Sequence, residues 1–527
     1  MAEITQLQTG GLYQLTDAAK AQIADSKYFN EDLAPTSFAD RNWNTFHISM
    51  LWVAMAICIP SLLMASGGVI AGLPVWASIL NVVLGNAIIL IPIQLNSHAG
   101  TKYGIPFPLF SRLTFGMRGA QIPTISRAIT ACGWNCIQSI TGAAAILFII
   151  KAISPAFNDM NFGAQVVAFL VFLALCAYVT AGGSKWIRNV ESFSSPILII
   201  LCIVLFIWAI ITASGAGYSF GDVFSTAPTM AAAYGGPVPV ATLSSNTAFL
   251  FVFLATLTGN IAFWATMALN IPDFSRYAKN QKAQFRGQMF GMVPAMAFCA
   301  VVGAFFAQST YLVYGAAYFN PVDVLGLIGQ SAGVRVLTVV VGLAVIFATL
   351  TTNIAANIVA PANGFSNLNP KKISYKGGVL IASFIAIAYY IPFMLSPTFQ
   401  GFMFGFLNIY GGFLAPLASI FILDYYWLKR KNVNILELYK DRGNYWYKSG
   451  FNFYAIIAWI AGSIIPTIAG LAGFGSPDQG PLAWINANAY LFAFFVALIV
   501  YAVISPRKGP HIMSDEEEAA ITEVVAS

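Results

Sequence analysis

Apolar stretches of about twenty residues recur along this chain from residue 47 to residue 505. A stretch of that length crosses the hydrocarbon core of a bilayer as a helix. Only 9% of the residues are charged, whereas a soluble globular protein has about 25%, so the chain cannot present its whole surface to water. The stretches are apolar throughout, unlike the alternating strands of a transmembrane barrel. The sequence therefore predicts an all-α integral membrane protein.

Twelve transmembrane helices are predicted, each with ends placed to within about four residues. The spans are 46–67, 74–97, 125–151, 163–182, 191–213, 246–271, 289–314, 334–361, 376–395, 400–424, 453–474 and 484–505. Basic residues are retained on the cytoplasmic side of a membrane. If both termini are cytoplasmic, all but two of the 26 Lys and Arg residues lie on that side; Lys151 and Arg335 are the exceptions. We therefore expect a multi-pass protein of the plasma membrane with both termini in the cytoplasm.

These spans divide the chain into four regions. They are a cytoplasmic N-terminal segment (1–45), a ten-helix transport core (46–424) with halves 46–213 and 246–424, a cytoplasmic loop with two additional helices (425–505), and a C-terminal tail (506–527). The N-terminal segment is polar and too short for a core of its own. The tail is acidic, and we expect it to be solvated, with a regulatory contact as the alternative.

Polar side chains concentrate in a few spans, although an unpaired polar group costs roughly 2–7 kcal/mol in an apolar medium. The third span contains Asn135 and Gln138. The eighth contains Thr351, Thr352, Asn353 and Asn357, all in the stretch TTNIAANIVAPAN, residues 351–363. Spans 1 and 6 are interrupted by Pro60 and Pro272 at matching positions of the two halves. Each residue alone could be structural, but interrupted helices at matching positions are typical of a transporter site at the bilayer midplane.

The polar groups in these spans are indoles, carboxamides and hydroxyls, and none of spans 1, 3, 6 and 8 has a carboxylate at its centre. Carriers of cationic substrates usually place a carboxylate in the path. Indole rings can stack on a flat solute, while carboxamides offer a donor and an acceptor to its edge. The pattern therefore favours a neutral, planar, hydrogen-bonding substrate. A small cyclic amide fits well, and a sugar fits in part.

Several segments make the chain resemble the nucleobase:cation symporter-1 family, which includes allantoin, hydantoin, uracil and cytosine permeases. They include NEDLAPTSFADRNWNTF (30–46), NSHAGTKYGIPFPLFSRLTFGMRGAQIPTISRAITACGWNCIQ (96–138), FWATMALNIPDFSRYAKNQKAQFRGQ (263–288) and TLTTNIAANIVAPAN (349–363). Within the family, the chain resembles bacterial allantoin permeases in particular. The resemblance covers nearly the whole chain. It implies a leucine-transporter-like fold of two inverted five-helix repeats plus two additional helices.

The resemblance also implies a substrate site. Trp134 and Trp264 would sandwich the planar ring, and Gln138 and Asn357 would bind its edge. Asn353 would contribute nearby polar contacts. In span 1, Cys58 stands where hydantoin or allantoin permeases would be expected to have an amide, and a thiol is a weaker hydrogen-bonding group.

A sodium site between spans 1 and 8 is implied in the same way. Its ligands would be the backbone carbonyls of Ala54, Ile57 and Ala348 and the hydroxyls of Thr351 and Thr352. The coupling cation is Na⁺ or H⁺, and no cofactor is expected.

The function expected from the sequence is secondary active import of a neutral nucleobase or hydantoin-type ring by cation-coupled symport with alternating access. The alternative is a transporter of the same fold for another small solute, such as a vitamin. An enzyme is not expected, because the three histidines lie near span ends or in the tail and no acid–base pair lies within the spans. A channel is disfavoured by the interrupted helices. The expected partners are the substrate and the lipid bilayer, without nucleic acid, and we expect a monomer.

Overall fold

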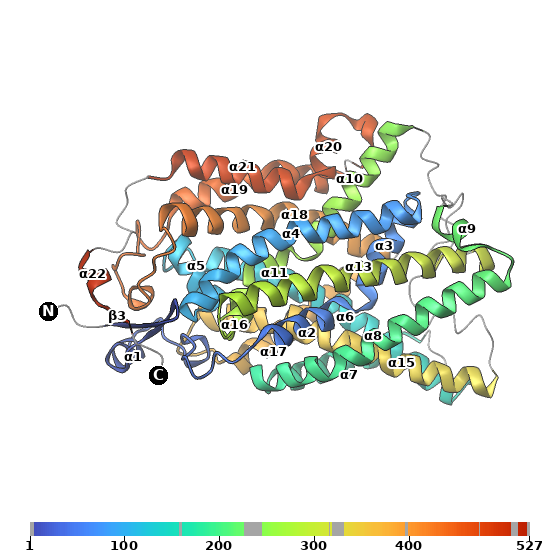
Figure 1. Ribbon diagram of the computed structural model, residues 1–527, viewed down its shortest axis with the longest axis horizontal. Helices are drawn as coiled ribbons and strands as arrows, with labels where there is room; N and C mark the ends of the chain where they lie inside the picture. The colour runs from blue at the N-terminus through green and yellow to red at the C-terminus, as the bar shows by residue number, and fades with distance from the viewer. Residues whose placement is uncertain are drawn as a thin grey trace.

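The structure is a computed structural model that describes residues 5–157, 161–225, 245–315, 317–318, 331–395, 399–473, 475–506 and 515–523. Long helices run side by side along the molecule, and both ends of the described chain lie at one end of the bundle (Figure 1). We call this end the terminal face. The prediction of an all-α membrane protein is confirmed: within the described residues, ten helices are long and apolar enough to span a bilayer, and two bent helix pairs bring the number to twelve.

The helices follow the predicted spans in order. The first half contains α2 (Thr45–Ala56), α3 (Ile59–Ile70), α4 (Val75–Tyr103), α5 (Phe107–Phe115), α6 (Gln121–Ile153), α7 (Phe162–Thr180), α8 (Ser184–Gly215) and α9 (Phe220–Ser225). The second half contains α10 (Asn246–Phe263), α11 (Ala265–Asn270), α12 (Pro272–Ser275), α13 (Gln281–Tyr314), α15 (Ala332–Thr352), the π-helix η2 (Asn353–Ile358), α16 (Val359–Leu368), α17 (Tyr375–Leu395), α18 (Phe399–Ile422) and the π-helix η3 (Leu423–Leu428). The remaining elements beyond this core are η4 (Leu436–Tyr439), α19 (Phe453–Leu471), η5 (Pro477–Gln479), α20 (Pro481–Ala487) and α21 (Ala489–Ile504).

The first span is broken where its proline predicts a break. The α2 helix ends at Ala56, α3 begins at Ile59, and the two axes differ by 58°. Cys58 lies between them in an extended conformation, with φ −149° and ψ 165°. Pro60 lies in the first turn of α3, where a helix has no partner for its N–H and the fixed φ of proline is favourable. The interruption therefore leaves carbonyls at the end of α2 outside the helical ladder.

The sixth span is broken at two places, only one of which was predicted. The α10 helix ends at Phe263, and Trp264, with φ −104° and ψ 10°, separates it from α11. A second interruption lies at Ile271, between the end of α11 at Asn270 and the start of α12 at Pro272, where the proline predicts it. The break at Trp264 was not predicted, because tryptophan has no sequence signal for a kink.

A further irregularity lies in the eighth span and was not predicted. The chain forms a π-helix over Asn353–Ile358 between α15 and α16, and all six of its residues are buried. A π-turn inserts one extra residue and is frequent at functional sites. It places the side chains of Asn353 and Asn357, four residues apart, on a common face.

The helices present an apolar outer surface. Large aliphatic and aromatic side chains on α4, α17 and α21 are exposed, for example Ile91 at 61%, Phe384 at 71% and Val503 at 76%. In water such a surface would be costly, whereas in lipid it is not. The surface is thus consistent with a protein that spans the bilayer many times.

The N-terminal segment forms a small domain on the terminal face. Strand β1 (Gln6–Thr9) pairs antiparallel with β2 (Leu12–Leu15), and helix α1 (Asp17–Ala24) and the 3₁₀ turn η1 (Glu31–Leu33) follow. Gly10 and Gly11 connect the strands with φ of +54° and +76°, which glycine adopts without steric cost. Arg41 is 4% exposed and donates to the backbone carbonyls of Thr36 and Thr101, which holds the segment against α4. Burial lowers the pKa of Arg41 to about 10, so it stays charged at neutral pH.

The acidic tail is bound to this domain, contrary to the expectation that it is solvated. Residues 515–519 form helix α22, and β3 (Ile521–Glu523) pairs in parallel with β1 to complete a sheet of order β2-β1-β3. The Glu517 carboxylate accepts hydrogen bonds from the side chains of Asn434 (3.1 Å) and Asn444 (2.6 Å). The physical reason is that the carboxylates near the C-terminus find amide donors in the loop that follows η3.

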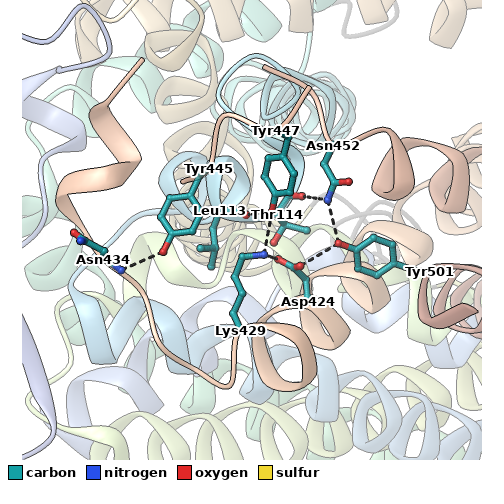
Figure 2. Close-up of polar contacts among 9 residues, drawn as sticks. All are labelled: Leu113, Thr114, Asp424, Lys429, Asn434, Tyr445, Tyr447, Asn452 and Tyr501. Carbon is teal, nitrogen blue, oxygen red and sulfur yellow. Dashed lines mark hydrogen bonds and ion pairs between the residues drawn. The ribbon is translucent and has the colours of Figure 1, made fainter. Parts of the chain in front are cut away.

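A buried ion pair joins the two additional helices to the transport core (Figure 2). Asp424 in η3 and Lys429 are both at most 1% exposed and form a salt bridge. Tyr501 of α21 donates to Asp424 at 3.0 Å, and Lys429 donates to the hydroxyl of Tyr447 at 3.0 Å. Asn452, which precedes α19, donates to Tyr501 and to the backbone of α5. The pair thereby connects α18, α19, α21 and α5.

We predict that Lys429→Met lowers the free energy of unfolding by about 3–5 kcal/mol, because Asp424 would remain buried without its cation. The double variant Asp424→Leu/Lys429→Met should recover most of this loss, since two apolar side chains leave no buried charge. Thermal unfolding of the detergent-solubilised protein measures both effects. If the single and double variants lost the same free energy of unfolding, the loss in Lys429→Met would not come from an uncompensated charge on Asp424.

Candidate functional site

Both predicted tryptophans belong to one buried aromatic cluster. Trp134 on α6 and Trp264 at the break of the sixth span are 4% and 2% exposed. Their rings each meet Phe263 edge to face, with centroids 5.2 Å and 5.0 Å from it, and Trp52 of α2 meets Trp264 in the same way at 5.2 Å. Phe263 and Trp52 were not predicted, because an aromatic residue within an apolar span carries no signal of its own.

A hydrogen bond fixes the orientation of Trp134. Its indole N–H donates to the hydroxyl of Tyr410 on α18 at 2.9 Å, and that hydroxyl donates to the carbonyl of Ala262 at 2.9 Å. All three groups are buried. Tyr410 therefore connects α6 to the last turn of α10, next to the break at Trp264.

The predicted carboxamides are connected through α6. Asn357 donates to the Oδ1 of Asn353 at 3.1 Å, and Asn353 donates to the Oδ1 of Asn135 at 2.7 Å and to the hydroxyl of Ser139 at 3.4 Å. Asn135 and Ser139 lie four residues apart on one face of α6. The π-helix and α6 are thus joined by a chain of amides, to which sequence reasoning did not assign Asn135.

Gln138 and Cys58 meet at the break of the first span. The Nε2 of Gln138 lies 3.7 Å from the sulfur of Cys58, and that sulfur lies 3.2 Å from the hydroxyl of Ser61. Cys58 is therefore in contact with the predicted site residues, at the position where the helix is interrupted.

Four polar atoms of these residues lack a partner among the described residues. They are the Oε1 of Gln138, the indole N–H groups of Trp264 and Trp52, and the Nδ2 of Asn135, and all four are buried. In an apolar medium an unpaired amide-like group costs roughly 2–7 kcal/mol, and more than nine in ten buried polar groups in native structures are paired. An acceptor and a donor left unpaired in one cluster therefore indicate a place where a ligand binds.

The two threonines face the free carbonyls at the end of α2. The Thr352 hydroxyl lies 3.1 Å from the carbonyls of both Ala54 and Met55, and the Thr351 hydroxyl lies 3.0 Å from that of Ala348 and 3.5 Å from that of Ala54. Hydroxyl and carbonyl oxygens are hard ligands of the kind that alkali and alkaline-earth cations prefer.

Four of the five predicted cation ligands are brought together in this way. The fifth, Ile57, is the first residue after the end of α2, and none of its described hydrogen bonds joins it to a threonine. Met55 contributes a carbonyl that was not predicted.

Arg127 is a further residue of this region that the sequence did not reveal. In the sequence it counts as one of the basic residues on the cytoplasmic side, but it lies within α6 and is 1% exposed. Its guanidinium donates to the carbonyl of Thr266 and the side chain of Asn270, both at 2.9 Å, and to the carbonyl of Ala356 at 2.8 Å. It thus joins α6, α11 and the π-helix, the three elements that carry the aromatic and amide residues.

A family model described as permeases for cytosine/purines, uracil, thiamine and allantoin matches residues 35–497. A purine-uracil permease of Arabidopsis thaliana is 35% identical over 498 residues, which cover 92% of this chain and 79% of that protein. An allantoin permease of Bacillus subtilis is 28% identical over 488 residues, 91% of this chain and 95% of that protein.

The fold also has a solved counterpart. Mhp1, a nucleobase-cation-symport-1 family transporter in a closed conformation with bromovinylhydantoin bound, matches with a TM-score of 0.75. The match covers 94% of this chain and 99% of that one at 23% sequence identity.

We predict that Tyr410→Phe lowers the free energy of unfolding by about 1–3 kcal/mol, since the indole N–H of Trp134 and the carbonyl of Ala262 would lose their buried partner. Tyr389→Phe is the matched control, because both tyrosine rings contact Phe406 but no described residue bonds to the Tyr389 hydroxyl. Thermal unfolding with tryptophan fluorescence measures the change. Equal stability of the two variants would contradict a role for the hydroxyl.

Proposed function

This chain belongs to the family of permeases for cytosine and purines, uracil, thiamine and allantoin, and on that basis we propose that it imports a neutral, planar nucleobase or hydantoin-type ring. It is a membrane transporter and not an enzyme. Its relatives are named as purine-uracil, allantoin, uracil and hydantoin permeases. All of those substrates are flat rings or ring-derived ureides with alternating N–H and C=O groups.

The observation that carries the substrate proposal is that buried polar atoms of the predicted site residues, among them the Oε1 of Gln138 and the indole N–H of Trp264, have no partner among the described residues. The Oε1 of Gln138 accepts an N–H of the ring, and the indole N–H of Trp264 donates to one of its carbonyls. Trp134 and Trp264 stack on the two faces of the ring, which requires Phe263 to move from between them. Asn357, with Asn353 behind it, binds the opposite edge.

Cys58 makes this site different from one in which the first span contributes an amide side chain at the same position. A thiol donates and accepts only weakly, and here it is already close to Gln138 and Ser61. It orients the Gln138 carboxamide and leaves one fewer strong contact for the ring. We propose that the substrate consequently depends more on Gln138 than it would with an amide at position 58.

We propose Na⁺ as the coupling cation, bound between the end of α2 and the end of α15. Its ligands are the hydroxyls of Thr351 and Thr352 with carbonyls of Ala54 and Ala348 and, at the helix break, of Met55 or Ile57. The threonine hydroxyls now donate to those carbonyls. Rotation of each hydroxyl proton away from the centre would convert both oxygens into ligands.

Binding of the cation connects to binding of the ring through short stretches of chain. Thr352 precedes Asn353, the residue that joins Asn357 to α6. Cys58, beside Gln138, follows the carbonyls at the end of α2 by a few residues. A cation that fixes both helix ends thus favours the arrangement that binds the ring, which is the requirement for symport by alternating access.

The proposed location is the plasma membrane, with both termini and hence the terminal face in the cytoplasm. The distribution of Lys and Arg supports this orientation. We further propose that the monomer is sufficient for transport, since each proposed ligand comes from a single chain.

We predict that cells expressing this chain accumulate one ring from a radiolabelled panel of allantoin, hydantoin, uracil, cytosine and hypoxanthine. Gln138→Ala should raise the half-saturating concentration about tenfold or more, because it removes a hydrogen bond of about 1.4 kcal/mol. Gln165→Ala on α7, outside the cluster, is the control and should leave uptake unchanged. Absence of uptake of any ring by correctly inserted protein would contradict the proposed substrate class and would favour another solute, such as a vitamin.

We predict that uptake of this ring requires sodium and persists with a protonophore. Thr352→Val has nearly the same shape but lacks the ligand oxygen, so it should raise the half-saturating sodium concentration about tenfold or more, whereas Thr352→Ser should stay close to the parent. The measurement is initial uptake rate against sodium concentration. Sodium-independent uptake that the protonophore abolishes would assign coupling to H⁺ instead.

A further inference from the structure

A cavity of about 700 Å³ opens on the terminal face, between the N-terminal segment and the transport core. Its rim carries exposed acidic side chains of the N-terminal segment, namely Glu31, Asp32 and Asp40. Its inner end is formed by buried residues of both parts, including Trp43, Asp273 and Asn363, each at most 4% exposed. The volume lies within the range of about 300–1,000 Å³ typical of small-molecule sites.

The inner end of this cavity leads toward the proposed substrate site. Val359 and Asn363, which line it, follow Asn357 by two and six residues along the η2–α16 helix. At 1.5 Å per residue, Asn363 lies about 9 Å beyond Asn357 along the helix axis. A ring that leaves the aromatic cluster toward the terminal face therefore reaches this cavity next.

Two of the three acidic groups at the rim, those of Asp32 and Asp40, already have partners. The Asp32 carboxylate accepts from the backbone N–H of Tyr375 at 2.8 Å, and the Asp40 carboxylate accepts from the hydroxyl of Ser37 at 2.6 Å. These bonds hold the N-terminal segment in place and reduce the capacity of the rim to bind a solute.

The inner end, in contrast, has polar groups with unused hydrogen-bonding capacity. Asn363 is 2% exposed, and no described residue bonds to its carboxamide, which offers one acceptor and two donor N–H groups. Asp273 accepts from the backbone N–H of Phe107 at 3.0 Å and from Asn270 at 3.4 Å, and a carboxylate has about four acceptor positions. The Asn363 carboxamide offers both a donor and an acceptor, and the Asp273 carboxylate offers a further acceptor. Together these groups match the alternating N–H and C=O groups of a cyclic amide.

Aromatic side chains complete this end of the cavity. Trp43 and Tyr277 stack with ring centroids 5.4 Å apart and an angle of 29° between the planes. Their backbones are also paired, because Trp43 N–H donates to the carbonyl of Tyr277 at 2.9 Å and its carbonyl accepts from Lys279 at 2.8 Å. The N-terminal segment is thereby attached to the chain that follows α12, and it supplies a rigid, flat wall.

We propose that the inner end of this cavity is a second binding site for the transported class of ring, occupied between the central aromatic cluster and release at the terminal face. Asn363 and Asp273 bind the amide edge of the ring, and Trp43 with Tyr277 forms the aromatic wall. Residues 31–43 thus form part of a solute site, in addition to packing against the transport core on the terminal face. The proposal rests on the proposed function, because it takes the ring from the central site.

The test is equilibrium binding of the radiolabelled ring identified by the uptake panel to full-length protein in lipid nanodiscs, at concentrations up to the millimolar range. The expected stoichiometry is two rings per chain with different affinities. Gln138→Ala should weaken the tighter site, and Asn363→Ala should abolish the weaker one while leaving the tighter one within twofold. Gln165→Ala on α7, which does not line the cavity, should retain both.

Uptake provides a second readout. Asn363→Ala should lower the maximal rate severalfold with little change in the half-saturating concentration, since the ring still enters through an unchanged central site. If Asn363→Ala does not insert stably, Asn363→Ser replaces it with the same expected loss of the weaker site.

The possible failures are distinguishable. One ring per chain, lost in Gln138→Ala, would overturn the second site and leave the proposed function intact; the cavity would then hold water. Two rings per chain in Asn363→Ala would also overturn it. Absence of binding and of uptake for every ring would overturn the proposed function and the second site together.

Discussion

A bilayer offers no water to a broken helix, so every backbone group freed by a break has to be bonded inside the protein. At the end of α2 the freed carbonyls of Ala54 and Met55 accept from Thr352. One residue later the π-helix begins, and Asn353 bonds to Asn135 of α6. The break, the threonines and the amide chain are therefore one structure, because none of them could be moved without leaving the others unpaired.

Much of this architecture follows from the sequence, because length and apolarity determine where a chain can cross a membrane. The break at Cys58 is predictable in the same way, since Pro60 restricts the backbone locally. The break at Trp264 and the π-helix are not. Both depend on contacts with distant residues, such as the bond between Asn353 and Asn135, and the intrinsic preferences of their own residues give no indication of them.

In the candidate site, too, some features could be predicted from the sequence and others depend on contacts with distant residues. Resemblance to a family identifies Trp134, Trp264, Gln138 and Asn357, but not the groups that orient them, namely Tyr410 and Asn135. Arg127 is the sharpest example. Its position near a span end made it count as a loop charge, whereas three acceptors from two other elements compensate its burial inside the helix bundle. Such compensation cannot be predicted from the sequence, because the acceptors of Arg127 come together only in the folded chain.

The parallel pairing of β1 with β3 has a consequence for biosynthesis. Residues 6–8 leave the ribosome about 515 residues before their partners, residues 521–523. During translation of the whole membrane domain, β1 has only the hairpin with β2, and the outer edge of that hairpin remains open. The sheet closes only after residues 521–523 have been made and lie on the same side of the membrane as residues 6–8. A truncated or wrongly inserted chain would keep an unpaired strand edge that cellular quality control can recognise.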